Sequence, residues 1–594
     1  MAKDLFGLLN GLRKVAVAFS SEIGSELQAI SRKASAILVP QSRSLKQQDA
    51  KTTNEVISED EVVEKSQLAK EFEELTKYQQ STSGPPTNRP PTNGPPTNSK
   101  RYHTWSACWR VGSRRSLHTS AVMRGGVTSD TIDAGRSKRR NKKQKIHHRA
   151  RERAVPASRL SRLVSFGGLA AGLGLGTATE VAKRAVGLSQ EVGGANISSA
   201  FLSEGNMERI VSTLCRVRGA ALKIGQIISL QDGSLVPEPM QEVFERVRNN
   251  ADFMPTWQLE SVLVNELGKD WRSKVEVFEP HPLAAASIGQ VHRAVLKDGR
   301  EVAMKIQYPG VAQSIDSDID NLMGVLKVWN ILPEGLFVDD VIAVARRELA
   351  WEVDYEREAE CGERFRELLA DDPRFGVPTI VPELSTKRVL TAELIHGLPL
   401  DQCHHLPQTL KNDISERIIS LCLRELFEFR FMQTDPNWSN FYFNETNNKI
   451  FLLDFGASRE YSNQFTDKYV KVIHAAVMGD NERVIELSKN INFITGYESK
   501  AHIAAYLDSL LILGEPFRSD TVFDFGSQDT TARVQRLLPS LLYDRLTPPP
   551  EECYSLHRKM AGSFLLCARL QAKFNCYNVF QKAVDNYQQS TLLA

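Results

Sequence analysis

The chain carries the stretch Asp435-Pro436-Asn437-Trp438-Ser439-Asn440 and, 14 residues after its end, the tripeptide Asp454-Phe455-Gly456. The tripeptide closes an apolar run at residues 450–453 that is typical of a buried strand. We therefore expect the carboxylates of Asp435 and Asp454 and the amide of Asn440 on one face. Hard oxygen ligands of this kind suit Mg2+, which keeps several waters and bridges phosphate oxygens. The two stretches predict a site for a magnesium-bound nucleotide, with Asn440 and Asp454 as metal ligands.

Two more motifs precede these stretches in the order, and near the spacing, that protein kinases use. Residues 284–291, Ala-Ala-Ala-Ser-Ile-Gly-Gln-Val, stand in place of the glycine-rich loop that covers the nucleotide phosphates. Residues 302–305, Val-Ala-Met-Lys, are typical of a strand and place Lys305 21 residues after Ala284. Four motifs in this order rarely arise by chance. We therefore expect an α+β, bilobal, protein-kinase-like fold that binds ATP and Mg2+, with phosphate contacts from Ala284, Ala285, Ala286, Ser287 and Lys305.

Two further features complete the predicted nucleotide site. Glu358 lies in a helical run at residues 341–369 and is predicted to pair with Lys305, as the helix-C glutamate does in kinases. An exposed helical glutamate is the alternative. Residues 389–395 are typical of the last strand of an N-terminal lobe, with a hinge at its end. The backbone expected to meet the adenine edge belongs to Ala392, Glu393, Leu394 and Ile395.

The chain also departs from the protein-kinase pattern. Gln433 replaces the histidine of the H-R-D motif, and no A-P-E motif follows Gly456. Residues 457–468 leave little room for an activation loop, so we expect no peptide-docking platform. Two unusual motifs are present instead, Lys223-Ile224-Gly225-Gln226 and Glu352-Val353-Asp354. Glu352 and Asp354 do not share a helix face, so by themselves they favour two solvated acids.

These motifs together resemble the signatures of the UbiB family, in particular the animal mitochondrial atypical kinases needed for coenzyme Q synthesis. The resemblance runs from about residue 155 to the C-terminus and includes residues 201–204 and 554–559. It implies that a helical extension carrying Lys223, Gly225 and Gln226 folds over the cleft near Glu352 and Asp354 and blocks a protein-substrate site. It also implies that the alanines at residues 284–286 alter nucleotide preference and restrain autophosphorylation. Alanine disfavours the positive φ angles that glycine accepts, so this fits.

The N-terminal quarter has a different composition. Residues 1–100 contain an amphipathic helical pattern at residues 5–23 and a disordered linker that ends in a Pro-Pro-Thr-Asn repeat. Residues 101–154 are basic, and residues 101–129 have the composition of a mitochondrial transit peptide. A solvated basic tail or an arm that binds anionic lipids is the alternative. Nucleic-acid binding is not expected, because no folded reading module accompanies the basic run.

Residues 163–179 form an uncharged run at the short limit for crossing a bilayer, and we predict a single transmembrane helix there. Within it Gly168, Gly172 and Gly176 line one helix face, which favours a homodimer through close backbone contact. A glycine-rich loop or a buried soluble helix is the alternative. The predicted folded parts are then a helical extension at residues 196–280, an N-lobe at 281–395 and a C-lobe at 396–594.

Three functions stay open at this level. The first is an ATPase that supports ubiquinone biosynthesis on the matrix side of the mitochondrial inner membrane, with anionic lipids and other coenzyme Q biosynthetic proteins as partners. The second is a protein kinase acting on mitochondrial proteins, and the third is a nucleotide-binding pseudokinase scaffold. In the enzymatic versions Asp435 orients water or a small hydroxyl for in-line attack on the γ-phosphate, and Glu358 aligns Lys305.

Overall fold

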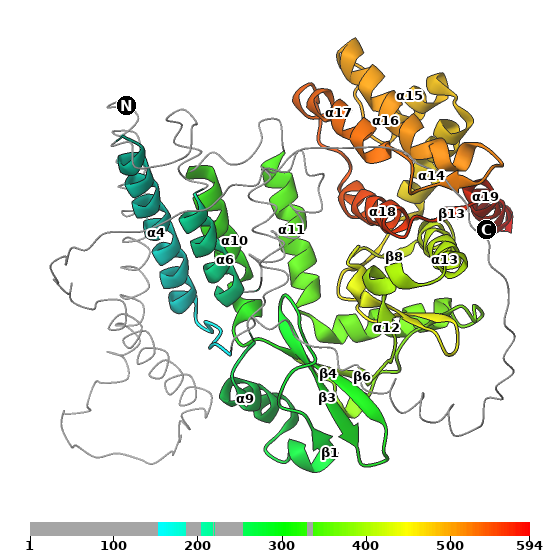
Figure 1. Cartoon of the computed structure of the whole chain (residues 1–594). Helices are drawn as coiled ribbons and strands as arrows, with labels where there is room; N and C mark the ends of the chain where they lie inside the picture. Colours follow the sequence, from blue (N-terminus) through cyan, green and yellow to red (C-terminus); the bar gives the residue numbers. More distant parts are fainter. Residues whose placement is uncertain (1–151, 186–202, 218, 220–252, 329–336, 594) are drawn as a thin grey trace, which may run out of the picture. The chain divides into compact units, whose positions relative to one another are not determined.

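The computed structural model describes residues 152–185, 203–217, 219, 253–328 and 337–593, which all belong to one compact unit (Figure 1). The predictions for residues 1–151 lie outside the described residues. So does the prediction that Lys223, Gly225 and Gln226 cover the cleft, because residues 220–252 are not described.

The first lobe is built on a five-stranded antiparallel sheet. Strands β1, β3, β4 and β6 lie side by side in this order, and β2 pairs with the start of β3. Alternation along β4 decides which side chains face the core: Val302, Met304 and Ile306 are buried, whereas Lys305 lies on the opposite face. The sheet thus turns Lys305 away from the core of the first lobe and toward the predicted nucleotide site. The strand bounds are Val275–Phe278, Ala284–Ala285, Gly289–Leu296, Glu301–Gln307 and Val389–Glu393.

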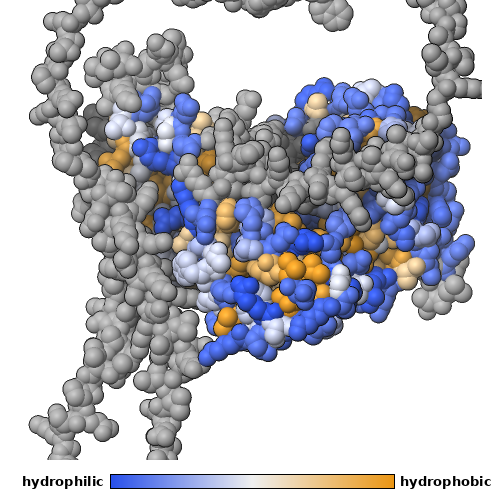
Figure 2. All heavy atoms as spheres, turned by 60° about the horizontal axis from the view of Figure 1, so that its bottom comes forward, coloured by the Kyte–Doolittle hydropathy of each residue, from blue (hydrophilic) through white to orange (hydrophobic). Residues whose placement is uncertain are grey.

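Helices cover the core side of this sheet. The short helix α9 (Thr256–Leu267) buries Leu259 and Leu263 against the strands. Seen from the side of the sheet and α9, the surface is largely hydrophilic around an apolar area (Figure 2). Two helices, α11 (Val338–Glu352) and α12 (Tyr355–Leu368), replace the single helical run predicted at residues 341–369. The break has a local cause: Asp354 caps α12 by accepting a hydrogen bond from the Arg357 backbone N–H at 3.1 Å.

The second lobe begins between the end of β6 at Glu393 and β7 (Leu398–Pro399), because β7 pairs with β9 rather than with the first sheet. Its small β elements surround the predicted catalytic loop: β8 (Phe431–Gln433) pairs with β11 (Ser458–Glu460), and β9 (Phe441–Asn444) pairs with β10 (Lys449–Leu452). Helices form most of the rest of this lobe, together with the short strand pair β12 (Phe523–Asp524) and β13 (Lys573–Phe574) (Figure 1). The helices are α13 Gln408–Phe427, α14 Asn463–Met478, α15 Asn481–Asn490, α16 Lys500–Arg518, α17 Thr530–Tyr543, α18 Glu551–Arg569 and α19 Cys576–Leu593.

The predicted membrane-spanning segment forms helix α4 (Arg159–Ala185), which contacts α6 (Glu204–Val217) and α10 (Val311–Val328). None of the helices in the described part of the chain combines the length and apolar character needed to cross a membrane. This corrects the prediction of a transmembrane helix at residues 163–179. Arg162, just before the uncharged run, is fully buried and donates three hydrogen bonds to Asp318 of α10, at 2.5–3.0 Å.

The glycine stripe of α4 faces α6 of the same chain. A Cβ added at Gly176 would lie 2.0 Å from Asn206 Oδ1, and one at Gly172 would lie 3.3 Å from Arg209 Cδ. Asn206 donates from Nδ2 to the Leu173 carbonyl at 3.2 Å, which the missing side chain of Gly176 permits. A Cβ at Gly168 would meet nothing within 4 Å. Close backbone approach is thus used within the chain, and homodimerisation through this face stays a prediction.

We expect Arg162→Met to lower the free energy of unfolding by about 3–5 kcal/mol, because it leaves the buried Asp318 carboxylate without its charged partner. Chemical unfolding followed by circular dichroism measures this loss. Arg366→Met serves as the matched control, since Arg366 pairs with Glu363 on the exposed face of α12. The double variant Arg162→Met/Asp318→Leu should recover most of the stability, because both charges are removed together. A loss no larger than that of the control would contradict a structural ion pair.

Candidate active site

Two carboxylates from distant segments meet at Lys305. Its Nζ donates to both carboxylate oxygens of Glu358 on α12, at 2.7 and 2.8 Å, and to Asp454 Oδ2 at 3.0 Å. Glu358 is 1% exposed, so the alternative of a solvated helical glutamate is wrong. The pairing of Lys305 with Glu358 is the geometry that the sequence predicted.

The charges of this cluster are set by burial and by one another. Burial by itself would lower the pKa of Lys305, but the carboxylates of Asp454 and Glu358 raise that pKa well above its usual value. Burial raises the pKa of Glu358 above its usual value, and the ammonium of Lys305 opposes this rise. Both oxygens of Glu358 accept hydrogen bonds from the ammonium, so we assign the pair as an ionised carboxylate and a charged lysine.

The alanine-rich segment forms a tight β-hairpin rather than an open loop. The Ala286 N–H donates to the Gly289 carbonyl at 2.7 Å, and the Ser287 carbonyl accepts from the Gly219 N–H at 3.0 Å. Gly289 cannot carry a side chain, because an added Cβ would lie 2.5 Å from the Ile306 carbonyl oxygen. Of the predicted phosphate-binding residues, Ala286 thus uses its backbone N–H to hold the turn, and Ser287 uses its carbonyl to bind the backbone of Gly219.

The predicted hinge follows β6. Glu393 donates its backbone N–H to the Thr379 carbonyl at 2.9 Å, and Leu394 donates to the Glu301 carbonyl at 3.0 Å. Ala392 pairs with Ala303 of β4 and also bridges to Ile380. These bonds hold most of the segment in the sheet, so within the predicted hinge set they favour Ile395 as the donor of an N–H to an adenine edge.

Asp435, Asn440 and Asp454 lie at the end of the β9–β10 hairpin. Asn440 donates from Nδ2 to Asp435 Oδ2 at 3.1 Å, which leaves its Oδ1 as the oxygen that a metal could use. The Asn440 carbonyl accepts from the Leu453 N–H at 3.0 Å, which brings Asn440 beside Asp454. Asp454 Oδ1 accepts from the Gly456 N–H at 3.1 Å.

This donor set fits Mg2+ only as part of a nucleotide complex. Within the described ranges, no three His, Cys, Asp or Glu side chains gather closely enough to hold a metal ion by themselves. One carboxylate from Asp454 and one amide oxygen from Asn440 match a cation that takes its remaining ligands from phosphates and water. The residues present therefore fit the predicted Mg2+.

Helix α12 also contacts the Asp-Phe-Gly segment through side chains other than Glu358. Phe455 is buried and packs against Phe365, with ring centroids 5.2 Å apart. Arg357 donates to the carbonyls of Gly456, at 3.1 Å, and Ser458. No motif or spacing points to Arg357, because its partners are backbone atoms about 100 residues away.

Comparison with known proteins agrees with this geometry. Residues 246–488 match the ABC1 atypical kinase-like domain. The chain is 56% identical over 479 residues to the zebrafish (Danio rerio) protein named "Atypical kinase COQ8B, mitochondrial", covering 80% of this chain and 76% of that protein. The rat protein of the same name is 54% identical over 521 residues, covering 87% of this chain and 98% of that protein. The chain belongs to the UbiB/ABC1 family of atypical kinases.

The relationship extends to fungi. The Saccharomyces cerevisiae protein named "Atypical kinase COQ8, mitochondrial" is 46% identical over 433 residues, which is 72% of this chain and 85% of that protein. The resemblance predicted from the short motifs is thereby confirmed.

The Glu-x-Asp motif of this ABC1 family member divides between two roles. Asp354 is exposed and caps α12, as a solvated acid would. Glu352 is only 7% exposed at the end of α11, so the expectation that both acids are solvated is wrong for Glu352. Its backbone lies beside the Asp-Phe-Gly segment, because a Cβ added at Gly456 would come 3.5 Å from Glu352 Cα.

An arginine far along the chain connects α11 to the second lobe. Arg558 of α18 donates to both oxygens of the buried Glu348, at 2.9 Å each. Burial by itself would lower the pKa of Arg558, but the negative charges of Glu348, Asp435 and Glu352 raise it above its usual value. In the sequence, Arg558 belongs only to the family resemblance at residues 554–559, and its contact with Glu348 is set by the tertiary structure.

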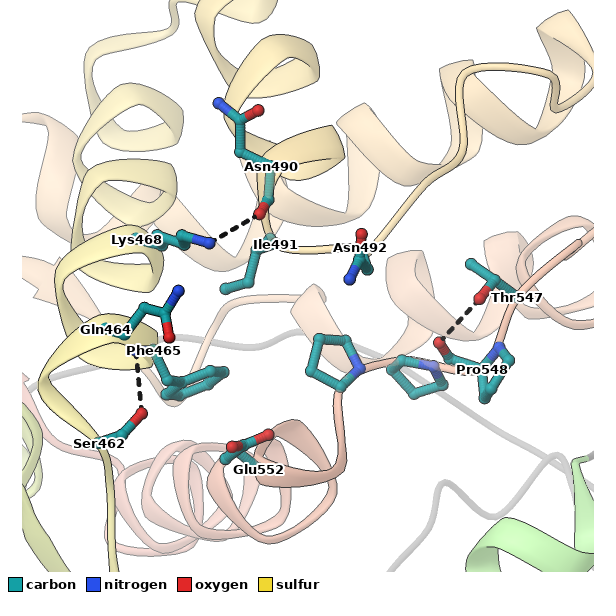
Figure 3. A pocket seen from close by; sticks show the side chains of 12 residues that line it. Ser462, Gln464, Phe465, Lys468, Asn490, Ile491, Asn492, Thr547, Pro548 and Glu552 are labelled. Atoms are coloured by element: carbon teal, nitrogen blue, oxygen red, sulfur yellow. Dashed lines mark hydrogen bonds between the residues drawn. The ribbon is translucent and has the colours of Figure 1, made fainter.

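A separate hollow of about 420 Å3 lies in the second lobe, between α14, the end of α15 and the start of α18 (Figure 3). Phe465, Lys468 and the run Pro548-Pro549-Pro550 line it, and Lys468 Nζ donates to the Asn490 carbonyl at 3.2 Å. None of the predicted site residues lines this hollow. The predicted nucleotide site around Lys305 is therefore separate from this hollow.

In Lys305→Met we expect the free energy of unfolding to fall as pH rises from about 5 to 8, by up to about 1.4 kcal/mol per pH unit. Burial raises the pKa of Glu358, and the variant lacks the ammonium that opposes this rise. The folded chain then keeps a proton that the unfolded carboxylate releases, so higher pH favours unfolding. Urea unfolding at a series of pH values measures the slope.

The control is Lys305→Met/Glu358→Gln, which has no titrating carboxyl at residue 358 and should lose most of this extra slope. The same pH dependence in the two variants and the wild type would contradict the prediction, because it would mean that burial does not raise the pKa of Glu358 when Lys305 is absent.

Proposed function

We propose that the chain is an ATPase of the phosphoryl-transfer type that supports ubiquinone biosynthesis in mitochondria. The observation that carries this proposal is the ionic contact of Lys305 with Glu358 and Asp454, beside the hydrogen-bonded pair Asp435 and Asn440. These five side chains match the parts that kinases use for Mg-ATP.

The proposed roles follow from the chemistry of each group. Lys305, aligned by Glu358, would bind the α- and β-phosphates, and Asp435 would orient water or a small hydroxyl for in-line attack. Asn440 and Asp454 would hold Mg2+, which when bound neutralises charge that develops on the phosphate oxygens. Most of the catalysis would therefore come from positioning and charge stabilisation.

The segment after Asp-Phe-Gly favours a small acceptor over a peptide. Strand β11 begins at Ser458 and helix α14 begins at Asn463, so no long activation segment separates them. Arg357 and the pairing with β8 hold the start of this short connection. A protein kinase acting on mitochondrial proteins would need an accessible peptide groove in this place, which is why we favour hydrolysis of ATP.

The location and partners are proposed from the relatives. The zebrafish, rat and yeast proteins are all named as mitochondrial atypical kinases. We propose that this chain works on the matrix side of the mitochondrial inner membrane, with anionic lipids and other coenzyme Q biosynthetic proteins, and without nucleic acid. Homodimerisation through Gly168, Gly172 and Gly176 would require α6 to leave Gly172 and Gly176.

The first test is Mg-dependent ATP hydrolysis by the full-length chain, with and without anionic vesicles and a phenolic mimic of a quinone precursor. We expect turnover that the lipid and the phenol stimulate, and about a 100-fold or larger loss of it in Asp454→Asn, which removes the negative metal ligand. Asp508→Asn changes an exposed aspartate of α16 in the same way and should leave the rate unchanged.

Asp435→Asn separates the ATPase from the pseudokinase scaffold. Loss of turnover with nucleotide binding intact would support the ATPase, because Asp435 would act on the attacking group and not on binding. Nucleotide binding without turnover by the wild type under every condition would favour the pseudokinase scaffold.

The alanine turn gives a second prediction. Ala286→Gly should tighten nucleotide binding by about two- to fivefold, because glycine can adopt the positive φ angles that turn backbone N–H groups toward phosphates. Isothermal titration with ATP and ADP measures the change. Ala370→Gly, in the exposed turn after α12, is the matched control for added backbone freedom. Equal affinities for Ala286→Gly and the wild type would count against a restraining role of the alanine.

A further inference from the structure

A lysine buried in the second lobe contacts the predicted catalytic loop from the side of helix α18. Lys559 of α18 is 1% exposed, and its Nζ donates to Gln433 Oε1 at 2.8 Å. The ammonium also lies over the rings of Phe441 and Trp438, 4.6 and 5.5 Å from their centroids. Cation–π contact of this kind stabilises a cation that has lost its water.

Gln433 carries this contact to the Asp-Phe-Gly segment. Its Nε2 donates to the backbone carbonyl of Asp454 at 3.2 Å. A lysine can only donate and a carbonyl can only accept, so the two partners together fix which way the amide of Gln433 points. Without Lys559 the amide would lose the contact that selects this orientation.

The rest of α18 holds Lys559 at this place. The Gly562 carbonyl accepts from Trp438 Nε1 at 3.1 Å, and a Cβ added at Gly562 would lie 2.4 Å from Pro436 Cβ. The helix backbone therefore approaches the catalytic loop as closely as a missing side chain allows. On the other side of Gln433, its backbone N–H donates to Oε1 of the fully buried Glu425 at 3.2 Å.

A purely structural lysine is the simpler explanation, and energetics count against it. Removing an ammonium from water costs several kcal/mol, and an apolar side chain of similar volume fills such a site at equal or lower cost. Burial also raises the pKa of the neighbouring Glu425 to about 7, against the opposing effect of Lys559. A polar group kept in so unfavourable a place is expected to do more than fill space.

We propose that Lys559 is a positioning residue, which fixes the amide of Gln433 and thereby holds Asp454 where it meets Lys305 and would bind Mg2+. In this chain, Gln433 and Lys559 together replace the histidine of the kinase H-R-D motif. The proposal rests on the function proposed above for Asp454. It adds a residue more than 100 positions away that acts on Asp454 only through Gln433.

The test measures how much Mg2+ strengthens the binding of ADP, which requires no turnover, in the full-length chain. We expect Lys559→Met to reduce this gain in affinity about 10-fold and to raise the Mg2+ concentration needed for ATP hydrolysis, as loss of a ligand-orienting partner does at metal sites. The affinity for ADP without metal should stay unchanged. Gln433→Met should have the same effect, and the double variant should lose no more than the worse single variant, because both act through one contact.

Lys582→Met, which alters an exposed lysine of α19, is the matched control, and melting temperatures identify any variant that fails to fold. Gln433→Met is isosteric and keeps the proposal testable should Lys559→Met not fold. A folded variant that lowers the melting temperature while keeping the full Mg2+ effect on ADP would overturn the positioning role. A wild-type chain whose ADP affinity does not respond to Mg2+ would overturn it too. Absence of ATP hydrolysis by the wild type would instead reject the proposed function, and the ADP measurement would still decide the role of Lys559.

Discussion

The ammonium of Lys305 is the charge around which the site is arranged. Its partners Glu358 and Asp454 lie 53 and 149 residues further along the chain, and each contributes an oxygen within 3.0 Å. A charge removed from water needs such partners, because the desolvation cost is otherwise several kcal/mol. Strand β4, helix α12 and the Asp-Phe-Gly segment must therefore meet in this one arrangement, which joins the two lobes at Lys305.

Further contacts restrain the elements that this cluster joins. Arg357 holds the backbone after Asp454, Arg558 ties α18 to α11 through Glu348, and Lys559 supports Gln433. In many kinases the helix that carries the glutamate and the activation segment move during regulation. Here that helix and the short segment after Gly456 are bonded to each other. These bonds restrain both elements in one arrangement.

Helix α4 illustrates how the same residues fit two physical environments. Its uncharged run, glycine stripe and flanking arginines are also features of membrane helices. In this structure the stripe receives Asn206 and Arg209 of α6, and Arg162 forms a buried ion pair with Asp318. Close backbone approach and charge pairing thus serve contacts within the chain, and sequence composition does not distinguish these uses.

The sequence by itself determined the kinase-like fold, the family and the set of residues around Lys305. Motifs such as residues 435–440 and 454–456 have their spacing fixed by a hairpin, so local geometry is enough to predict that Asp435, Asn440 and Asp454 meet. Only the tertiary structure decided the partner of Arg162, the burial of Glu352 and the contacts of Arg558 and Lys559. These depend on segments up to 210 residues apart, which pack by shape and burial and leave no periodic or spacing signal in either segment.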